Sequence, residues 1–354
     1  MQVWRLFLLL FLSSLMYACQ VAPPEAKVRN YQELFGKTMG TTYSIKYYDA
    51  QERNLQGLID SAFYLYNLEV STYIPSSTIS QFNQSERGIA LSYQAETGVS
   101  ENNQYFVANF KRGQEISTIT EAAFQPTIMP LVNYWGFGYT EKRAVTSVDS
   151  LKVDTLLSFI GLDKIQMTED SLIKMNPEVQ LDFSGIAKGY GADLIAALLE
   201  EREIKDYFIE IGGDVLAKGL SPRGDDWVFG ITVPLPEAGL MEFMTTAPLK
   251  NKAVATSGNY RIYFEVEGEK YGHTINPYTG FPEKNSLLSV SAFAKDAASA
   301  DAFATACMVM GYEKASQLAE ANAELEAYFI VGMPDGTMKT YFSSGLSDVF
   351  EKDQ

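Results

Sequence analysis

A run of small and charged residues near the middle of the chain constrains the fold more than any other segment. Residues 182–193 read Asp-Phe-Ser-Gly-Ile-Ala-Lys-Gly-Tyr-Gly-Ala-Asp. The preceding residues 177–181 are strand-like, and the apolar residues within 186–199 have helical spacing. Gly185 is therefore expected at a strand-to-helix junction, where backbone groups and a helix N-terminus can face a phosphate or an ion. The same pattern also occurs as an ordinary turn before a helix.

Hydrophobic periodicity along the rest of the chain predicts a mixture of strands and helices. Strands are expected at 41–48, 207–211, 227–233, 260–266, 287–294 and 327–331, and helices at 55–66, 104–119, 151–159, 297–310 and 312–321. This order indicates an α+β fold rather than regular βαβ alternation. No Gly-x-Gly-x-x-Gly run follows a strand, so a Rossmann flavin site is not expected.

The charge balance is strongly acidic. The 354 residues include 28 Lys and Arg against 44 Asp and Glu, for a net charge of −16. This excess argues against nucleic acid, or an anionic membrane surface, as the main partner. It is compatible with a nucleotide, because a metal ion and backbone amides can hold phosphates on an acidic protein.

The N-terminus looks like a bacterial lipoprotein signal. Residues 1–18 carry a single charge, Arg5, and an apolar run too short to be a stable membrane span. Leu15-Met-Tyr-Ala-Cys19 follows, so Cys19 would become the lipidated first residue; an ordinary secretory signal is the alternative. Residues 19–34 contain two prolines and are expected to form a tether. The protein is then expected in the bacterial cell envelope, anchored by lipid and facing the periplasm.

Seven further motifs accompany the central run. They read Thr38-Met-Gly-Thr41, Ser71-Thr-Tyr73, Phe124-Gln-Pro-Thr127, Glu210-Ile-Gly-Gly-Asp214, Ala255-Thr-Ser-Gly-Asn259, Gly272-His-Thr-Ile-Asn-Pro-Tyr-Thr-Gly280 and Ser299-Ala-Asp-Ala-Phe-Ala-Thr305. Each is weak alone, but together and in this order they resemble the ApbE family of FAD:protein FMN transferases. The resemblance implies a mixed α+β architecture related to the T-fold, with a flavin-nucleotide cleft, in a domain at residues 35–350.

Two oxygen-bearing side chains suggest a magnesium site. Asp301 and Thr305 are four apart in a helical stretch and so share one face. A carboxylate and a hydroxyl suit Mg²⁺, which takes further ligands from water and substrate phosphates. Asp301 could also be an ordinary acid at a helix N-terminus. The resemblance implies Mg²⁺ at Asp301 and Thr305, with further ligands near Gly185 and Ala304.

The same resemblance implies an FAD site. Its expected lining is Met39, Tyr73, Ala123, Phe124, Gln125, Asp182, Lys188 and Ile275. Flat or apolar side chains suit a flavin or adenine ring, and Lys188 offers a cation to the pyrophosphate. The chain departs from the family at Ala122-Ala-Phe-Gln125, where Gly-Ala-Phe-Asp is common, so Gln125 lacks the usual charge.

His273 is the only histidine of the chain. A neutral imidazole can take a proton from an attacking hydroxyl near neutral pH, and the residue lies within a family motif. We therefore expect His273 to be catalytic or to position the reactants; a structural role in a loop is the alternative. The family commonly has Asp where Asn276 stands, and Asn276 would orient the imidazole more weakly.

The implied reaction moves FMN from FAD to a Thr or Ser hydroxyl of an acceptor redox protein, with release of AMP. The acceptor supplies the nucleophile, which agrees with a chain that has no Ser-His-Asp or Cys-His signature. Two alternatives remain open at this point. One is an FAD pyrophosphatase that yields FMN and AMP, and the other is a non-catalytic FAD-binding lipoprotein.

Overall fold

The computed structural model describes residues 29–91, 103–140, 148–235, 237–239, 242–259, 263–266 and 269–351. Residues 1–18 and Cys19 lie outside these ranges. The folded unit begins at Tyr31, so residues 31–34 belong to the first strand and not to the expected tether. Among the helices in the described ranges, none combines the length and the apolar character needed to span a bilayer.

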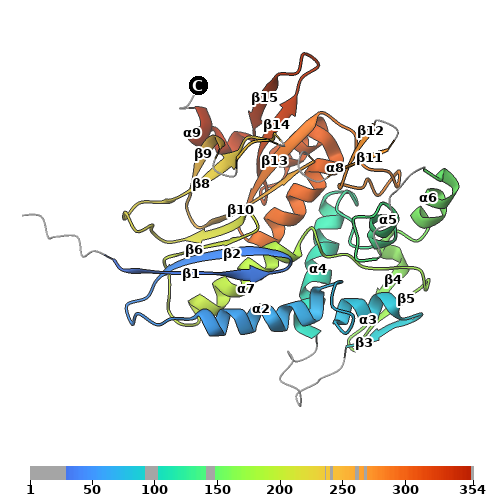
Figure 1. Ribbon diagram of the computed structural model, residues 1–354, viewed down its shortest axis with the longest axis horizontal. Helices are drawn as coiled ribbons and strands as arrows, with labels where there is room; N and C mark the ends of the chain where they lie inside the picture. Colours follow the sequence, from blue (N-terminus) through green and yellow to red (C-terminus); the bar gives the residue numbers. More distant parts are fainter. Residues whose placement is uncertain are drawn as a thin grey trace, which may run out of the picture. The chain divides into compact units, whose positions relative to one another are not determined.

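An antiparallel sheet of eight strands forms the centre of the domain (Figure 1). Each strand is antiparallel to its neighbour, which confirms the predicted α+β class. The order across the sheet is β1 (Tyr31–Thr38), β2 (Thr41–Tyr48), β6 (Tyr207–Ile211), β7 (Asp214–Lys218), β10 (Lys252–Gly258), β13 (Leu287–Ala294), β14 (Glu326–Gly332) and β15 (Met338–Phe342).

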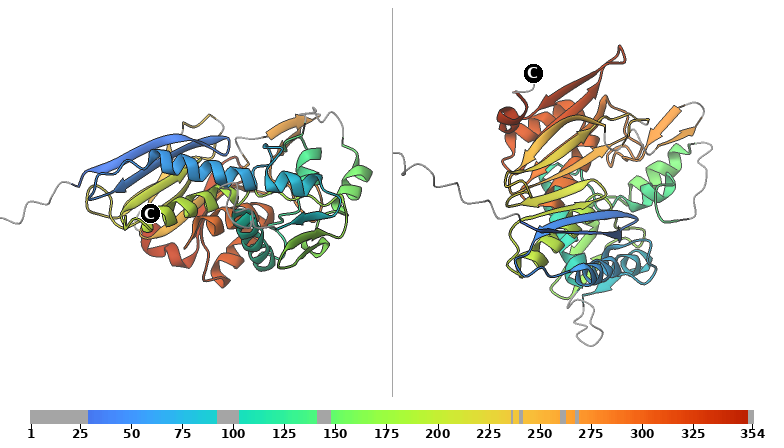
Figure 2. Two further views of the ribbon diagram at one scale, coloured as in Figure 1. Left: turned by 90° about the horizontal axis from the view of Figure 1, so that it is seen from below. Right: turned by 60° about the vertical axis from the view of Figure 1, so that its left-hand side comes forward.

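Both faces of this sheet are covered (Figures 1 and 2). Helices α7 (Ala187–Glu200) and α8 (Ala297–Ala321) pack on one face, with α2 (Gln56–Val70) and α4 (Gln104–Ile119) packed against them. The other face carries the ribbon of β8 (Trp227–Thr232) and β9 (Phe243–Leu249), with α9 (Ser347–Phe350). The alternation of a strand explains how β10 serves both cores: Ala253 and Ala255 belong to the helical core, and Val254 to the opposite one.

Shorter elements form a lateral part of the domain. They are α3 (Thr78–Gln84), β3 (Gly88–Ala90), α5 (Met129–Tyr134), α6 (Ser150–Leu157), η2 (Leu162–Lys164), β4 (Ile165–Met167), β5 (Ser171–Lys174), β11 (Tyr263–Val266) and β12 (Glu269–Gly272). The short helix η3 (Ser344–Leu346) instead packs beside α9 and β14. A small core of Leu131, Trp135, Val153, Ile160 and Ile275 joins α5 and α6 to the loop that carries the histidine motif.

Residues 177–181 do not form the expected strand, so this part of the sequence interpretation is wrong. A side chain takes the place of a neighbouring strand: Asn83 Nδ2 donates to Leu181 O over 2.9 Å, and Asn83 Oδ1 accepts from Leu181 N over 2.7 Å. Gln180 adds an isolated bridge to Ile128. An extended backbone needs its hydrogen bonds satisfied, but a side-chain amide can satisfy them without a ladder.

The glycines of the central run permit close packing of α7. A Cβ on Gly189 would lie 2.0 Å from Ala297 O at the start of α8, and one on Gly191 would lie 2.7 Å from Met39 Cε. Asp193 also joins α7 to the start of α8, because its two carboxylate oxygens accept from the N–H groups of Ala297 and Ala298 over 2.8 Å each. The run therefore fixes α8 against α7.

A buried carboxylate lies at the other end of this helical layer. Glu69 Oε2 accepts from Tyr105 N over 2.8 Å and from Phe106 N over 2.9 Å at the start of α4. Its Oε1 is buried and has no hydrogen-bond partner in the part of the chain that the structure describes. Burial raises the pKa of Glu69 from 4.5 to about 7.

We expect this carboxylate to make the fold less stable as the pH rises from about 5 to about 8. The unfolded chain releases the proton near pH 4.5, whereas the native state keeps it until about pH 7, so stability is lost between these values. The difference corresponds to at most about 3 kcal/mol. Urea denaturation at both pH values should show a smaller loss for Glu69→Gln, which cannot ionise.

The exposed Glu313→Gln is the matched control and should keep the pH dependence of the wild type. If Glu69→Gln loses as much stability over this range as the wild type, Glu69 is not the group responsible.

Candidate active site

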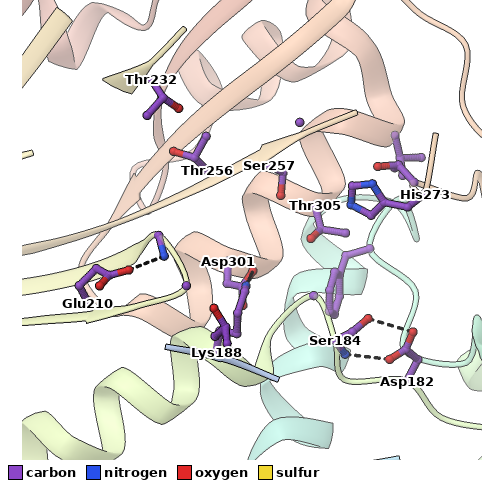
Figure 3. Close-up of a pocket in the computed structure, with 18 of the residues that line it drawn as sticks. Asp182, Ser184, Lys188, Glu210, Thr232, Thr256, Ser257, His273, Asp301 and Thr305 are labelled. Atoms are coloured by element: carbon purple, nitrogen blue, oxygen red, sulfur yellow. Dashed lines mark hydrogen bonds and ion pairs between the residues drawn. The ribbon is translucent and has the colours of Figure 1, made fainter. Parts of the chain in front are cut away.

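A cleft of about 920 Å³ opens at the edge of the central sheet. Its walls come from the turn between β6 and β7, the β8–β9 ribbon, the end of β10, the loop around His273 and the starts of α7 and α8 (Figure 3). Ten of the predicted site residues line it: Ala123, Phe124, Gln125, Asp182, Gly185, Lys188, His273, Ile275, Asp301 and Thr305. Segments distant in the sequence thus meet in one cavity.

Two hairpin turns lie next to each other at this edge. Gly212 and Gly213 connect β6 to β7 with φ of 57° and 95°, and Met39 and Gly40 connect β1 to β2 with φ of 47° and 74°. Such turns match the twist of the strands and favour glycine. They adjoin because β2 pairs with β6, and Gly212 N donates to Thr42 O over 3.0 Å. Two family motifs, 38–41 and 210–214, are therefore neighbouring turns.

Lys188 lies between two buried carboxylates. Its Nζ is 2.5 Å from Asp214 Oδ2 and 3.2 Å from each carboxylate oxygen of Asp301. Burial by itself would lower the pKa of Lys188, but the two carboxylates outweigh it and raise that pKa well above its usual range. Burial, reinforced by the nearby Asp301 charge, raises the pKa of Asp214 although Lys188 opposes the shift. Lys188 is thus fully charged at neutral pH.

Three of the four expected magnesium ligands, Gly185, Asp301 and Thr305, are brought together at the cleft. Asp301 and Thr305 are one turn apart on α8 and both face the cleft (Figure 3). A Cβ on Gly185 would lie 2.8 Å from Thr305 Oγ1, so the backbone at Gly185 closes over that hydroxyl. In the described ranges, no three His, Cys, Asp or Glu side chains form a metal cluster. A cation here would depend on one carboxylate, a hydroxyl and backbone or phosphate oxygens, which fits the ligand set of Mg²⁺.

Asp182 stands at the entrance to α7. Its carboxylate accepts from Ser184 N over 2.8 Å and from Ser184 Oγ over 3.0 Å, while Asp182 N donates to Pro126 O over 2.8 Å. Burial raises the pKa of Asp182. The Asn83 contact with Leu181 fixes the chain one residue earlier, so Asp182 is held from both sides. Sequence patterns missed Asn83 because its partner is 98 residues away.

The segment with unusual family residues also lines the cleft. Ala122 has a φ of 70°, a left-handed conformation that glycine adopts without strain and that alanine rarely adopts. Gln125 Oε1 accepts from Thr127 Oγ1 over 2.9 Å. The Gln125 side chain is therefore anchored beside the cleft without a charge.

Hydrogen bonds join the loop around His273 to the end of α5 and to the segment that precedes α5. The imidazole meets the ring of Phe137 edge to face at 6.3 Å between centroids. Trp135 Nε1 donates to Gly280 O over 2.7 Å, and Tyr278 OH donates to Glu121 O over 2.6 Å. The Asn276 amide bonds within its own turn and donates to Glu283 Oε2 over 2.6 Å. Asn276 thus shapes the loop that presents the histidine.

Three predicted residues do not contribute to the lining of the cleft. Met39 packs beside Gly191 of α7, and Tyr73 is 72% exposed in the loop between α2 and α3. Ala304 is wholly buried within α8, because it faces the helical core while its neighbour Thr305 faces the cleft. Their expected contacts with the nucleotide or metal stay predictions.

Sequence patterns also left three site features without a role. Asp214 was noted in a motif but not assigned, and neither Glu210 nor the wall formed by Phe229 and Phe243 was expected in the cleft. A signal for Asp214 was present in its position directly after a Gly-Gly turn. The ribbon carried no such signal, because its place over the cleft depends on tertiary packing alone.

The fold and the cleft define an α+β protein whose cavity has the cation, carboxylates and hydroxyls suited to a nucleotide. The chain belongs to the ApbE family, whose model matches residues 39–329. It is 36% identical to the FAD:protein FMN transferase of Vibrio cholerae, over 97% of this chain and 99% of that protein. It is 34% identical to the enzyme of the same description from Haemophilus influenzae, over 95% and 93% of the two chains.

Solved structures confirm the fold. The flavin transferase ApbE from Vibrio cholerae superposes with a TM-score of 0.80 at 33% identity, covering 91% of this chain and all of the other. The flavinyl transferase ApbE from Pseudomonas stutzeri, in its apo form, gives a TM-score of 0.77 at 29% identity, covering 91% and 97%. The family resemblance of the motifs is therefore confirmed over nearly the whole described domain.

Proposed function

We propose that this protein is an FAD:protein FMN transferase that forms a phosphoester between FMN and a Thr or Ser hydroxyl of an acceptor protein. Family membership and relatives of that description over 97% of the chain support the activity. The observation in the structure that carries it is the charged cluster in the cleft, where Lys188 and Asp301 meet beside Thr305. The Lys188 ammonium can face a pyrophosphate, and Asp301 with Thr305 can hold a metal cation beside it.

The proposed reaction balances without a nucleophile from the enzyme. The acceptor hydroxyl oxygen bonds to the phosphorus on the FMN side of FAD, the pyrophosphate P–O bond breaks, and AMP leaves with that oxygen. His273 lies in the cleft and takes the hydroxyl proton. Lys188 stabilises the negative charge of the phosphates, because its ammonium is held charged in a partly dehydrated site.

Mg²⁺ is proposed at Asp301 and Thr305, with backbone oxygens at Gly185 and Ala304 as further ligands. When bound, it would neutralise phosphate charge as a Lewis acid. The donor set fits, since hard oxygens line this corner and Gly185 brings its backbone close to the Thr305 hydroxyl. Asp182 is proposed to accept from a hydroxyl of the nucleotide, and Gln125 to form a hydrogen bond with one of its polar groups. Phe124 and Ile275 are proposed to lie against its rings.

The activity is tested by AMP release with FAD and Mg²⁺, in the presence and absence of an acceptor with an exposed Thr or Ser in a loop of small residues. A transferase releases AMP only when the acceptor is present and yields a flavin-fluorescent acceptor band on a denaturing gel. Equal release of AMP without acceptor would instead establish a pyrophosphatase, and no AMP in either case would favour a binding protein.

We also propose a lipid anchor at Cys19, which would hold the enzyme at the cell envelope on the periplasmic side. A tether of this kind raises the effective concentration of acceptor proteins on the same membrane. Cys19→Ala should stay unlipidated and leave the membrane fraction, which fractionation and mass spectrometry of the N-terminal peptide would show. An unmodified Cys19 in the wild-type protein would contradict the anchor.

A further inference from the structure

Asp214 makes the shortest contact of the charged cluster, yet the proposed reaction gives it no role. Its Oδ2 is 2.5 Å from Lys188 Nζ, while both Asp301 oxygens are at 3.2 Å. Both carboxylates are buried, with side-chain exposures of 3% for Asp214 and 4% for Asp301. The backbone of Thr256 on β10 also faces the Asp214 carboxylate and lowers its pKa, against the larger effect of burial.

The balance of charge in this cluster is incomplete. One ammonium faces two carboxylates, which leaves one negative charge in a buried setting where an uncompensated charge is costly. A divalent cation at Asp301 would reverse the sign and leave one positive charge, which suits an anionic phosphate. The cluster is thus suited to gain a cation.

Lys188 and a divalent cation compete for the same carboxylate. In the structure, Lys188 Nζ is 3.2 Å from each of the two oxygens of Asp301, so the ammonium engages both. A cation can replace it there only if Lys188 keeps another partner. Asp214 is that partner, and it already makes the closer contact.

We propose that Asp214 is a positioning residue that retains Lys188 and so frees Asp301 for a divalent cation. The proposal rests on the proposed function for the identity of the site. Without Asp214, the lysine would have Asp301 as its only carboxylate in the cluster, and the cation would have to displace a fully paired ammonium.

The test uses Mn²⁺ as the probe and measures its binding to the full-length protein by electron paramagnetic resonance, without FAD or acceptor. Asp214→Asn keeps the shape of the side chain but removes its charge. We expect Mn²⁺ to bind this variant at least about tenfold more weakly than the wild type. In transfer assays, the Mg²⁺ concentration for half-maximal rate should rise, with the rate recovering at high Mg²⁺.

Lys188→Met separates a role through the lysine from a simple effect of charge. If Asp214 acts by retaining Lys188, Asp214→Asn should no longer weaken Mn²⁺ binding in the Lys188→Met background, since the competitor is gone. An equal loss of affinity in both backgrounds would contradict the proposal. Thermal melts establish that each variant is folded before binding is measured.

Glu210→Gln is the matched control, because it removes one negative charge from the same β6–β7 hairpin. Glu210 bonds to Gly213 N over 2.7 Å and not to the lysine. The affinity of Glu210→Gln for Mn²⁺ should stay within about twofold of the wild type. Mn²⁺ that fails to bind the wild type would overturn the metal site as well, whereas equal binding by wild type and Asp214→Asn would overturn only the role of Asp214.

Discussion

Asp301→Asn should abolish FMN transfer, with a loss of turnover above about 10³-fold. The substitution removes the carboxylate that lies one turn from Thr305 on α8 and is proposed to hold the divalent cation. FAD should still bind in part, because the ring contacts of the cleft remain. The fold should not be weakened, since Lys188 would then face one buried carboxylate instead of two. Steady-state transfer assays, FAD titration and thermal melts measure these three properties.

The control for this variant is Asp296→Asn, five residues earlier at the same helix. Asp296 caps α8 by accepting from Ser299 N over 2.8 Å, and because Asn is an equally good N-cap residue the variant should keep nearly the full stability. Its transfer rate should nevertheless match the wild type. Full activity of the wild type in EDTA, or of Asp301→Asn with Mg²⁺, would contradict the metal site.

His273→Ala should lower the transfer rate by about 10²–10⁴-fold, the usual contribution of general acid–base catalysis. The expected cause is loss of the group that takes the acceptor proton, so the effect should fall on kcat and leave FAD affinity nearly unchanged. Transfer assays with saturating FAD and acceptor measure kcat, and FAD titration measures the affinity.

Tyr278→Phe is the control that separates a catalytic role of His273 from a structural role of its loop. Tyr278→Phe removes a tie of the same loop to Glu121 O and should change the rate by no more than about threefold. If the transfer rate of His273→Ala falls less than tenfold across the pH range, or if Tyr278→Phe loses as much activity, His273 is a structural residue of its loop and not a catalytic one.

Local patterns predicted the elements whose sequence carries a clear period. The strand at Thr41–Tyr48 and the helix at Gln104–Ile119 have the expected bounds, because alternation and helical spacing are properties of the segment itself. The break between the two helices expected at 297–310 and 312–321 also exists, as Gly311 within α8 has a φ of 71°. These features required no knowledge of distant contacts.

Elements that depend on tertiary packing were missed or misread. β10 is a central strand with alanines on one face, so it shows little hydrophobic alternation. Residues 177–181 looked like a strand, but their backbone is satisfied by the side chain of Asn83. Periodicity cannot reveal a partner that is distant in the chain.

The candidate site shows the same division. The family motifs identified Lys188 and Asp301, but the structure alone shows that Asp214 shares the lysine with Asp301. Met39 fell within a motif, yet its side chain packs against α7, because a hairpin turn directs it there. Motifs select positions, whereas the direction of each side chain follows from the packing around it.

The central claim is that the enzyme attaches FMN to another protein, and intact-mass spectrometry of the acceptor tests it most directly. The acceptor is incubated with FAD, Mg²⁺ and either the wild-type enzyme or Asp301→Asn. The proposed function predicts a mass gain equal to FMN minus water, on a single Thr or Ser, with the wild type alone. An acceptor of unchanged mass, while FAD is converted to free FMN and AMP, would contradict it.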